Sequence, residues 1–497
     1  MLLTSRLVGR CVLGLLQPYR VVLMLAAIAG VFAANISAQS TGKNPVIIIP
    51  GVTGSQLVNP NTGKTVWFDV KRDRDDDIRL PMTSPVLSRN RDSLVAKDII
   101  REIKLKVLPD VEVYQVLIDE LKAKGYKEAN WNKPEATDVF YVFAYDWRRD
   151  NVESAHLLMR KMAAVKRAVR RPGLKFDILA HSMGGLVARY AAMYGLADLP
   201  REGAKPVPTW KGAVHIGKLM MFGTPNEGSA SALDALLNGY PIIASRKLPF
   251  IDDFRAEDVF TAPSAFQLLP HSSAARFLDQ NLKPLEVDLY DPNVWFKYGW
   301  GPLSDPKFLS KLKDASELVA KNDEVEAEKK KDLVGDDLII SQTTFAQARA
   351  YFVSALSRAK RFHLALDAPS RRAVPIQLFA YGGNCEPTLD AIVLIRDEKK
   401  SQWETWFDAD KIKTASGLEI KKDEVKAAMY AIGDGKVTQR SLLAETSQPA
   451  KQGKNFHPTL PIKTSFFTCG SHTKLFLEKP IKDSFLSALV VETQQQP

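Results

Sequence analysis

The sequence lacks the features that mark several protein classes. It has only three cysteines among 497 residues, no internal repeat of the solenoid kind, and no succession of hydrophobic runs typical of a polytopic membrane protein. A hydrophobic content of 45% and a charged content of 25% exclude the disordered and fibrous classes. The chain is long enough for one large elaborated domain or about three average ones.

Acidic residues are missing from the first 38 positions. Three arginines there precede the uncharged run VVLMLAAIAGVFAA at 21–34, and small residues follow it. The run is shorter than the roughly 20 residues that span a bilayer. We therefore expect a signal peptide at 1–38, cleaved near Ala38, and a secreted or periplasmic protein, with an uncleaved membrane anchor as the alternative.

The three cysteines leave two readings open. Cys11 falls within the expected signal peptide and has no lipobox-like context. Cys385 and Cys469 form either one disulfide in an oxidising compartment or two buried thiols.

Charge and motifs restrict the partners. Removing the signal peptide, which holds three arginines, lowers the net charge from +11 to +8, and the remaining positive charge is spread along the chain. This balance favours anionic surfaces such as phospholipid head groups over nucleic acid. NTGKT at 61–65 resembles the end of a phosphate-binding loop, but Val58 occupies the position that needs glycine. We expect no cofactor, no metal and no nucleic acid, and the sequence does not indicate an oligomeric state.

Apolar runs that end in turn signals predict a buried parallel sheet. Continuous hydrophobicity, as opposed to alternation, indicates burial on both faces, and a helical pattern at 152–170 fits a helix that covers such a sheet. The class is therefore α/β. The runs are PVIIIPG at 45–51, VFYVFAYDW at 139–147, KFDILAHS at 175–182, KLMMFGTP at 218–225 and PIQLFAYGG at 375–383.

Two stretches do not fit the sheet and predict the domain organisation. The charged segment and following helical pattern at about 59–125 indicate an excursion beside the core, and residues 230–370 indicate a cap and lid insertion. The core then comprises residues 39–229, interrupted by the excursion, and residues 371–497.

Ser182 stands between a buried strand and a helix in AHSMGG. A nucleophilic serine on such a sharp turn needs small residues two positions away on each side, and Ala180 and Gly184 meet that need. A serine that only caps the helix explains neither the strand nor the small neighbours. In this architecture the acid and then the histidine follow the serine.

Sequence order and local setting select the other members of a triad. His472, in TCGSHTKLF, precedes a terminal amphipathic helix, whereas His457 lies in a connector. Asp434 stands between two glycines that allow a tight turn. Two backbone N–H groups, from Val52 and Met183, are the expected donors of an oxyanion hole. The other late aspartates are expected to be surface charges: Asp390, Asp397, Asp408 and Asp410.

Together these residues resemble the lecithin:cholesterol acyltransferase-like family of α/β hydrolases, which includes lysosomal phospholipase A2 and phospholipid:diacylglycerol acyltransferase. The similarity covers nearly the whole mature chain and implies an α/β-hydrolase fold with Ser182, Asp434 and His472 as its triad. The motifs that carry it are PVIIIPGVTGSQL, YDWR at 145–148, AHSMGG, FGTPNEGS at 222–229, PSAFQLLP at 263–270, GDGKV and GSHTK.

The resemblance also implies supporting features. Asp146 and Arg148 would form an ion pair that braces the site, although a purely structural salt bridge is equally compatible. Trp67 falls where the family has a membrane-binding region, and a core tryptophan is the alternative. A mobile lid would occupy residues 230–260, with a buried cap helix as the alternative. The apolar lid residues expected to meet acyl chains are Leu236, Ile242, Phe250 and Phe254.

The sequence thus predicts a serine-dependent lipid acyl hydrolase or O-acyltransferase acting at a membrane or lipid surface. An acyl-serine intermediate would pass its acyl group to water or to an alcohol. A carboxylesterase or lipase acting on neutral esters is the alternative within the same chemistry. A non-catalytic lipid-binding protein is a third reading. It would leave the serine, the acid and the histidine in these settings unexplained.

Overall fold

The computed structural model describes residues 42–68, 78–103, 111–112, 114–240, 254–313, 340–413, 419–445 and 460–490. The chain divides into the units Met1–Lys43 and Asn44–Pro497, and everything below concerns the second. The expected signal peptide and His457 lie outside the described residues. Within the described ranges, no helix has the length and apolar character needed to cross a membrane.

A seven-stranded sheet forms the centre of this unit, and each of its strand pairings is parallel. Its strands, in spatial order, are β20 (Ile462–Thr468), β13 (Gln377–Gly383), β10 (Ile216–Phe222), β9 (Phe176–His181), β1 (Val46–Ile49), β8 (Val139–Val142) and β7 (Lys127–Glu128). Every residue of β1, β9 and β10 is buried, as the continuous apolar runs predicted.

Helices cover both faces of the sheet because successive strand residues point to opposite sides. In β1, Ile47 and Ile49 join one buried cluster and Val46 and Ile48 another. The first cluster includes α3 (Asn151–Ala168) and α4 (Met183–Tyr194), and the second includes α2 (Gln115–Ala123) and α15 (Lys479–Val490). A parallel sheet covered on both faces, with this strand order, confirms the predicted α/β-hydrolase fold.

The excursion is shorter than we expected. A small antiparallel sheet of β3 (Thr65–Trp67), β2 (Ser55–Val58) and β4 (Val95–Ile99) forms it. The helix α2, which we had assigned to the excursion, packs on the main sheet through Leu117 and Leu121. Its helical pattern could not tell which surface it covers, so the sequence set the boundary too late.

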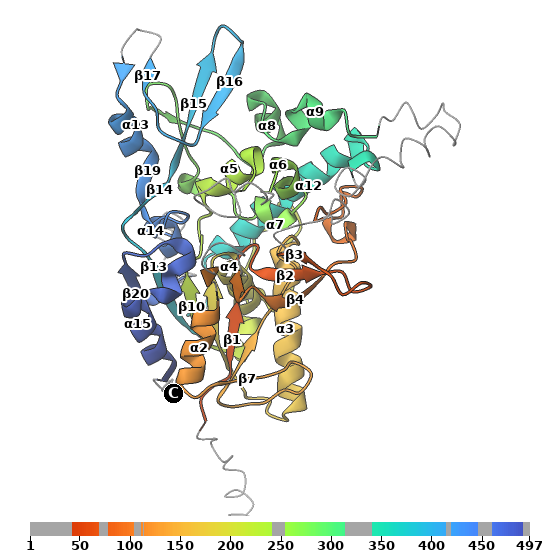
Figure 1. Ribbon diagram of the computed structural model, residues 1–497, viewed down its shortest axis with the longest axis vertical. Coiled ribbons are helices and arrows are strands. Elements are labelled where there is room, and N and C mark those ends of the chain that lie inside the picture. The colour runs from red at the N-terminus through yellow and green to blue at the C-terminus, as the bar shows by residue number, and fades with distance from the viewer. Residues whose placement is uncertain are drawn as a thin grey trace, which may run out of the picture. The chain divides into compact units, whose positions relative to one another are not determined.

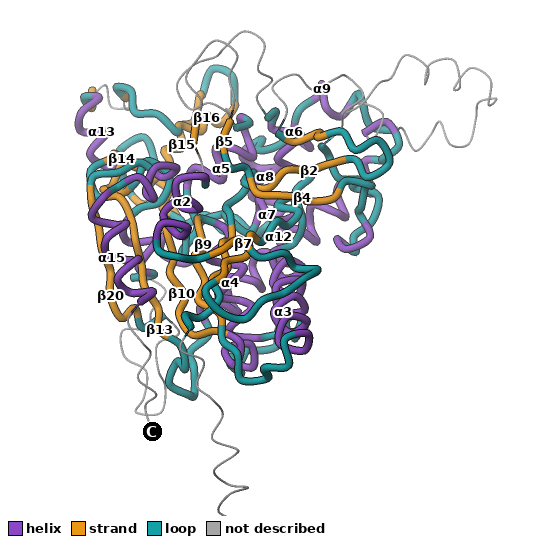
Figure 2. The backbone as a smooth tube through the Cα atoms, turned by 60° about the horizontal axis from the view of Figure 1, so that its bottom comes forward, coloured by secondary structure: helices purple, strands orange, loops and turns teal. Residues whose placement is uncertain are grey.

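The cap is built from two separate parts of the chain around an apolar cluster of its own. Its mixed sheet joins the strands β12 (Pro284–Leu285), β11 (Arg276–Leu278), β15 (Ala391–Asp397) and β16 (Gln402–Trp406), with β11 and β15 parallel. In Figures 1 and 2 these strands and the cap helices lie beyond one end of the main strands. The strands β15 and β16, expected in the C-terminal core, therefore pack in the cap, because β15 pairs with β11.

The remaining elements connect these layers. The cap helices are α5 (Ala230–Asn238), α6 (Ala256–Phe260), α7 (Pro263–Phe266), α8 (Pro292–Tyr298), α9 (Pro306–Leu309), α12 (Phe345–Asp367) and α13 (Lys422–Met429). Short pairs and a further helix are β5 (Glu102–Ile103) with β6 (Val111–Glu112), β14 (Glu386–Leu389) with β19 (Tyr430–Gly433), β17 (Ile412–Lys413) with β18 (Glu419–Ile420), and α14 (Gln439–Leu443). The long helix α12 joins the two layers: Phe352 packs in the cap cluster and Phe362 in the core cluster.

Candidate active site

Ser182 occupies a strained turn between β9 and α4. Its backbone has φ 52° and ψ −127°, a combination that L-residues rarely adopt, and its side chain makes no capping hydrogen bond to the helix. The hydroxyl lies 3.0 Å from Nε2 of His472 instead. The helix-cap alternative therefore does not describe what the Ser182 side chain does.

The small residues around Ser182 are explained by close backbone approach. A Cβ atom at Gly184 would lie 2.5 Å from the carbonyl oxygen of Pro50, in the loop that follows β1. Such a contact is far inside van der Waals distance and would force the two turns apart. Gly184 thus allows the β1 loop and the Ser182 turn to meet.

His472 and Asp434 complete a hydrogen-bonded chain with Ser182. His472 Nδ1 lies 2.8 Å from Oδ2 of Asp434, which leaves Nε2 free to accept the Ser182 hydroxyl proton. Oδ1 of Asp434 accepts the backbone N–H groups of Lys436 at 3.0 Å and Val437 at 2.7 Å. The three predicted triad residues, 252 and 38 positions apart, come together at the carboxyl ends of the parallel strands.

The environment keeps Asp434 ionised. Burial by itself would raise the pKa of its carboxyl group, but the charge and hydrogen bond of His472 and the two backbone N–H donors outweigh burial and lower that pKa. An ionised carboxylate accepts the Nδ1 proton and fixes the ring orientation of His472. The sequence analysis gave no role to Gly223, which has a φ of 55°. Its lack of a Cβ leaves room for the side chains of Asp434 and His472. A Cβ there would lie 2.8 Å from the Asp434 carboxylate.

The two expected oxyanion donors come from the loop after β1 and from the N-terminus of α4. Val52 borders the cavity described below, and Met183 is the first residue of α4, directly after the serine. The N-terminus of α4 adds a favourable dipole for negative charge at this point.

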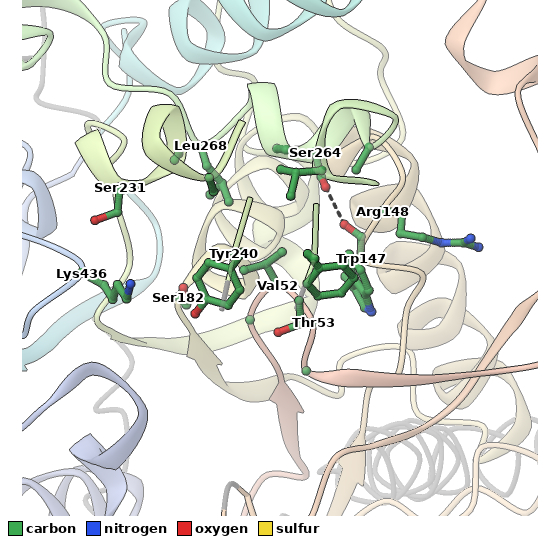
Figure 3. Close-up of a pocket in the computed structure, with 18 of the residues that line it drawn as sticks. Val52, Thr53, Trp147, Arg148, Ser182, Ser231, Tyr240, Ser264, Leu268 and Lys436 are labelled. Atoms are coloured by element: carbon green, nitrogen blue, oxygen red, sulfur yellow. Dashed lines mark hydrogen bonds between the residues drawn. The ribbon is translucent and has the colours of Figure 1, made fainter. Parts of the chain in front are cut away.

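Ser182 and His472 face a cavity of about 240 Å³ with mostly apolar walls, shown in Figure 3. One part of the wall comes from the core loops and the small sheet, including Val52, and the other from the cap, including Ala235 and Leu268. The Lys436 side chain also borders the cavity, with its ammonium group 5.2 Å from the centre of the Tyr240 ring. A cavity of this composition suits an acyl chain better than a polar ligand.

Three aromatic rings join the two parts of the wall. The ring of Trp67 lies 5.8 Å from that of Trp147 and 4.6 Å from that of Phe254, which belongs to the cap. Only 3% of Trp67 is exposed to solvent. This burial supports the core reading of Trp67 over a membrane-binding role.

The Asp146–Arg148 ion pair exists and has a third member. Nη2 of Arg148 lies 2.8 Å from Asp146, and Nη1 lies 2.6 Å from Asp92. Burial by itself would lower the pKa of the Arg148 guanidinium. Together the carboxylates of Asp146 and Asp92 outweigh burial and raise that pKa, so Arg148 stays charged. The sequence missed Asp92, which lies in the excursion and carries no motif. The backbone carbonyl of Arg148 accepts a hydrogen bond from Ser264 N–H at 3.4 Å, which links the pair to the cap.

The expected lid residues have different fates. Phe254 is buried and borders the cavity, whereas Leu236 packs in the apolar cluster of the cap, as the buried-helix alternative predicted. Ile242 and Phe250 lie outside the described residues.

Cys385 and Cys469 are joined by a disulfide that closes a separation of 84 residues. Cys385 lies two positions after the end of β13, and Cys469 lies three positions before His472. The bridge therefore holds the loop that carries His472 against the end of a central strand. This is the first of the two readings that the sequence left open.

Comparisons with known proteins found one curated relative and several solved structures with distant similarity. An uncharacterized protein of Saccharomyces cerevisiae, YJR098C, is 22% identical over 91% of this chain, which spans only 62% of that relative. Solved structures include the Tle4–Tli4 complex, with 13% identity, a TM-score of 0.39 and coverage of 90% of this chain and 97% of that one. Another is the mature lipase BlEst2 of Bacillus licheniformis, with 11% identity, a TM-score of 0.31 and coverage of 92% and 96%. TM-scores this low support no conclusion about the fold or the activity of this chain.

The family comparison is decisive because it covers most of the chain. The model of the lecithin:cholesterol acyltransferase family matches residues 64–442, which include Ser182, Asp434 and the cap. This match confirms the resemblance drawn from the sequence motifs. The chain belongs to the lecithin:cholesterol acyltransferase family.

Proposed function

We propose that this protein, an acyl hydrolase or acyltransferase by family, cleaves a fatty acyl ester of a lipid through a covalent acyl-serine. The observation that carries the proposal is the hydrogen-bonded chain from Ser182 through His472 to Asp434 at the wall of an apolar cavity. A purely structural role would not require an ionised carboxylate, an oriented imidazole and a strained serine to be joined by hydrogen bonds.

The reaction follows from these positions. His472 Nε2 accepts the Ser182 proton while Oγ attacks the ester carbonyl carbon, and Asp434 stabilises the imidazolium that forms. The N–H groups of Val52 and Met183 donate to the oxyanion, each worth about 3 kcal/mol of transition-state stabilisation. His472 then returns the proton to the leaving alcohol, and the acyl-serine remains.

The second half-reaction reverses these steps with a different acceptor. Water or an alcohol gives its proton to His472 and attacks the acyl-serine, which releases a fatty acid or a new ester and restores Ser182. Exclusion of water by the cap would favour the alcohol. We propose a phospholipid or a similar lipid ester as acyl donor, and a neutral acylglycerol or simple carboxylic ester as the alternative.

Two measurements test the proposal. A fluorophosphonate should label Ser182 in the folded protein and fail with Ser182→Ala, whereas the control Ser154→Ala, which changes a buried serine of α3, should label normally. Mixed phospholipid vesicles with and without a long-chain alcohol or sterol should then yield fatty acid or a new ester. A folded protein with no adduct on Ser182 would exclude both ester-cleaving readings and leave only lipid binding.

We also propose export after cleavage near Ala38, on the basis of the N-terminal sequence. The disulfide between Cys385 and Cys469 suits an oxidising compartment. N-terminal sequencing of the mature protein tests this. An intact N-terminus on the exported protein would favour the membrane anchor.

A further inference from the structure

A second hydrogen-bonded chain lies directly beneath the triad. The backbone N–H of Gly51 donates to Tyr114 Oη at 2.9 Å, and that oxygen lies 2.8 Å from His181 Nδ1. His181 Nε2 in turn lies 3.0 Å from the backbone carbonyl oxygen of His472. The chain therefore joins the loop after β1 to the loop that carries His472. The mechanism proposed above uses neither Tyr114 nor His181.

The protons in this chain have only one consistent arrangement. The His472 carbonyl can only accept, so His181 Nε2 carries a proton and donates it. In a neutral imidazole Nδ1 then accepts, so the Tyr114 hydroxyl donates to it and receives the Gly51 N–H on its oxygen. Every group in the chain is satisfied in this arrangement.

Burial keeps both side chains neutral. Burial first, and the nearby His472 second, lower the pKa of His181 to about 3, against smaller opposite effects of the hydrogen bond with the His472 backbone and of Asp434. Burial also raises the pKa of Tyr114, against a smaller effect of the Gly51 N–H. The proton that leaves Ser182 therefore stays on His472 and does not move to the adjacent histidine.

The hydrogen-bonded chain connects the two groups that must meet the substrate carbonyl, the Val52 N–H and the His472 imidazole. Gly51 precedes Val52, and the Gly51 carbonyl accepts the N–H of Gly54 at 3.1 Å. From the other side, Tyr145 Oη donates to the carbonyl of Pro50 at 2.9 Å. Tyr114 is thus the contact that ties the Val52 loop to the residue beside Ser182 and, through it, to His472.

We propose that Tyr114 and His181 are positioning residues that set the Val52 N–H and the His472 imidazole at the right separation for one tetrahedral intermediate. The inference rests on the proposed function. It predicts a loss in the chemical step and not in substrate binding, because neither side chain is needed to hold an acyl chain.

Tyr114→Phe tests the first contact. The variant removes one hydroxyl, and we expect kcat on a short p-nitrophenyl ester to fall roughly tenfold to a hundredfold with KM unchanged. The matched control is Tyr141→Phe, because the Tyr141 hydroxyl also donates one hydrogen bond and accepts one, both with the backbone of Glu135. The control should lose comparable thermal stability and keep its kcat.

His181 variants test the second contact. In His181→Gln the amide can accept from Tyr114 and donate to the His472 carbonyl, so we expect kcat within a few fold of the wild type. His181→Leu keeps the bulk without the hydrogen bonds and should lose as much as Tyr114→Phe. The double variant Tyr114→Phe/His181→Leu should be no worse than either single variant, because each change breaks the same chain.

The outcomes separate this inference from the proposed function. Ser182→Ala is measured in the same assay, and activity that survives it would overturn the triad itself. With Ser182 essential, three results would overturn only the positioning role: equal kcat values for Tyr114→Phe and Tyr141→Phe, a loss confined to KM, or losses that multiply in the double variant.

Discussion

The core wall and the cap wall of the cavity are built in different ways. On the core side, strained turns and hydrogen bonds hold Ser182, His472 and Asp434, and a Cβ at Gly184 would not fit. On the cap side, α5 to α7 offer apolar side chains such as Ala235. The difference teaches that directional bonds hold the reacting groups, whereas non-directional apolar contacts shape the space for substrate.

The largest expected effect lies in the core. Ser182→Ala should lower kcat by about 10⁴-fold or more, and Asp434→Asn should come close to it, because the asparagine amide can donate to Nδ1 and hold His472 in the tautomer whose Nε2 carries the proton. Steady-state kinetics on a short ester measures both. A comparable loss from a cap substitution would contradict the division between the two walls.

The second-largest effect is expected from loss of the disulfide, which holds the loop that carries His472. Replacing both Cys385 and Cys469 by serine removes a bridge across 84 residues and should lower the free energy of unfolding by about 2–5 kcal/mol. Urea unfolding measures this, and the fluorophosphonate labelling rate below the transition reports on the site. An unchanged midpoint would show that the histidine loop is held by other contacts.

The buried His181 should make the free energy of unfolding depend on pH in acid. The unfolded chain takes up a proton on His181 below about pH 6.5, whereas the folded protein does so only near pH 3. The contribution of His181 to the free energy of unfolding therefore falls as the pH falls through this window, by at most about 1.4 kcal/mol per pH unit. The groups that face the ring are His472, Asp434 and Tyr114.

The measurement is the difference in pH slope between the wild type and His181→Gln. A difference is needed because burial raises the pKa of Asp177 to about 6, which makes that group stabilise the folded state on acidification over part of the same window. Equal slopes for the two proteins would mean that His181 titrates normally.

The smallest effect is expected in the cap. Ala235→Trp would fill part of the cavity from α5 and should lower kcat/KM for a long-chain ester roughly tenfold or less, with a short ester unaffected. The control Asn238→Trp adds the same ring at the exposed end of that helix. Equal losses on short and long esters would indicate that the cap also orders the reacting groups.

Much of the core followed from local patterns. The five apolar runs predicted central strands correctly, because burial on both faces leaves a continuous signature. The motif order also identified the family, which the family model confirms. The catalytic roles of Ser182, Asp434 and His472 stay predictions, although the structure brings the three side chains within hydrogen-bonding distance.

The missed features depend on contacts between distant segments. Asp92 and Tyr114 carry no motif, and their partners Arg148 and His181 lie 56 and 67 positions away. The pairing of β11 with β15, which places β15 and β16 in the cap, has the same origin. A strand pattern reports burial and not the identity of its neighbour.

The amino-acid sequence alone determined the α/β class, the position of the Ser182 turn and the family, because apolar periodicity and close-packed small residues are local requirements. Only the tertiary structure decided which helix covers which face, how the cap is assembled and which buried polar groups hold the β1 loop beside His472. Those outcomes depend on hydrogen bonds and packing between segments far apart in the chain, and such contacts are formed only when the sheet brings those segments together.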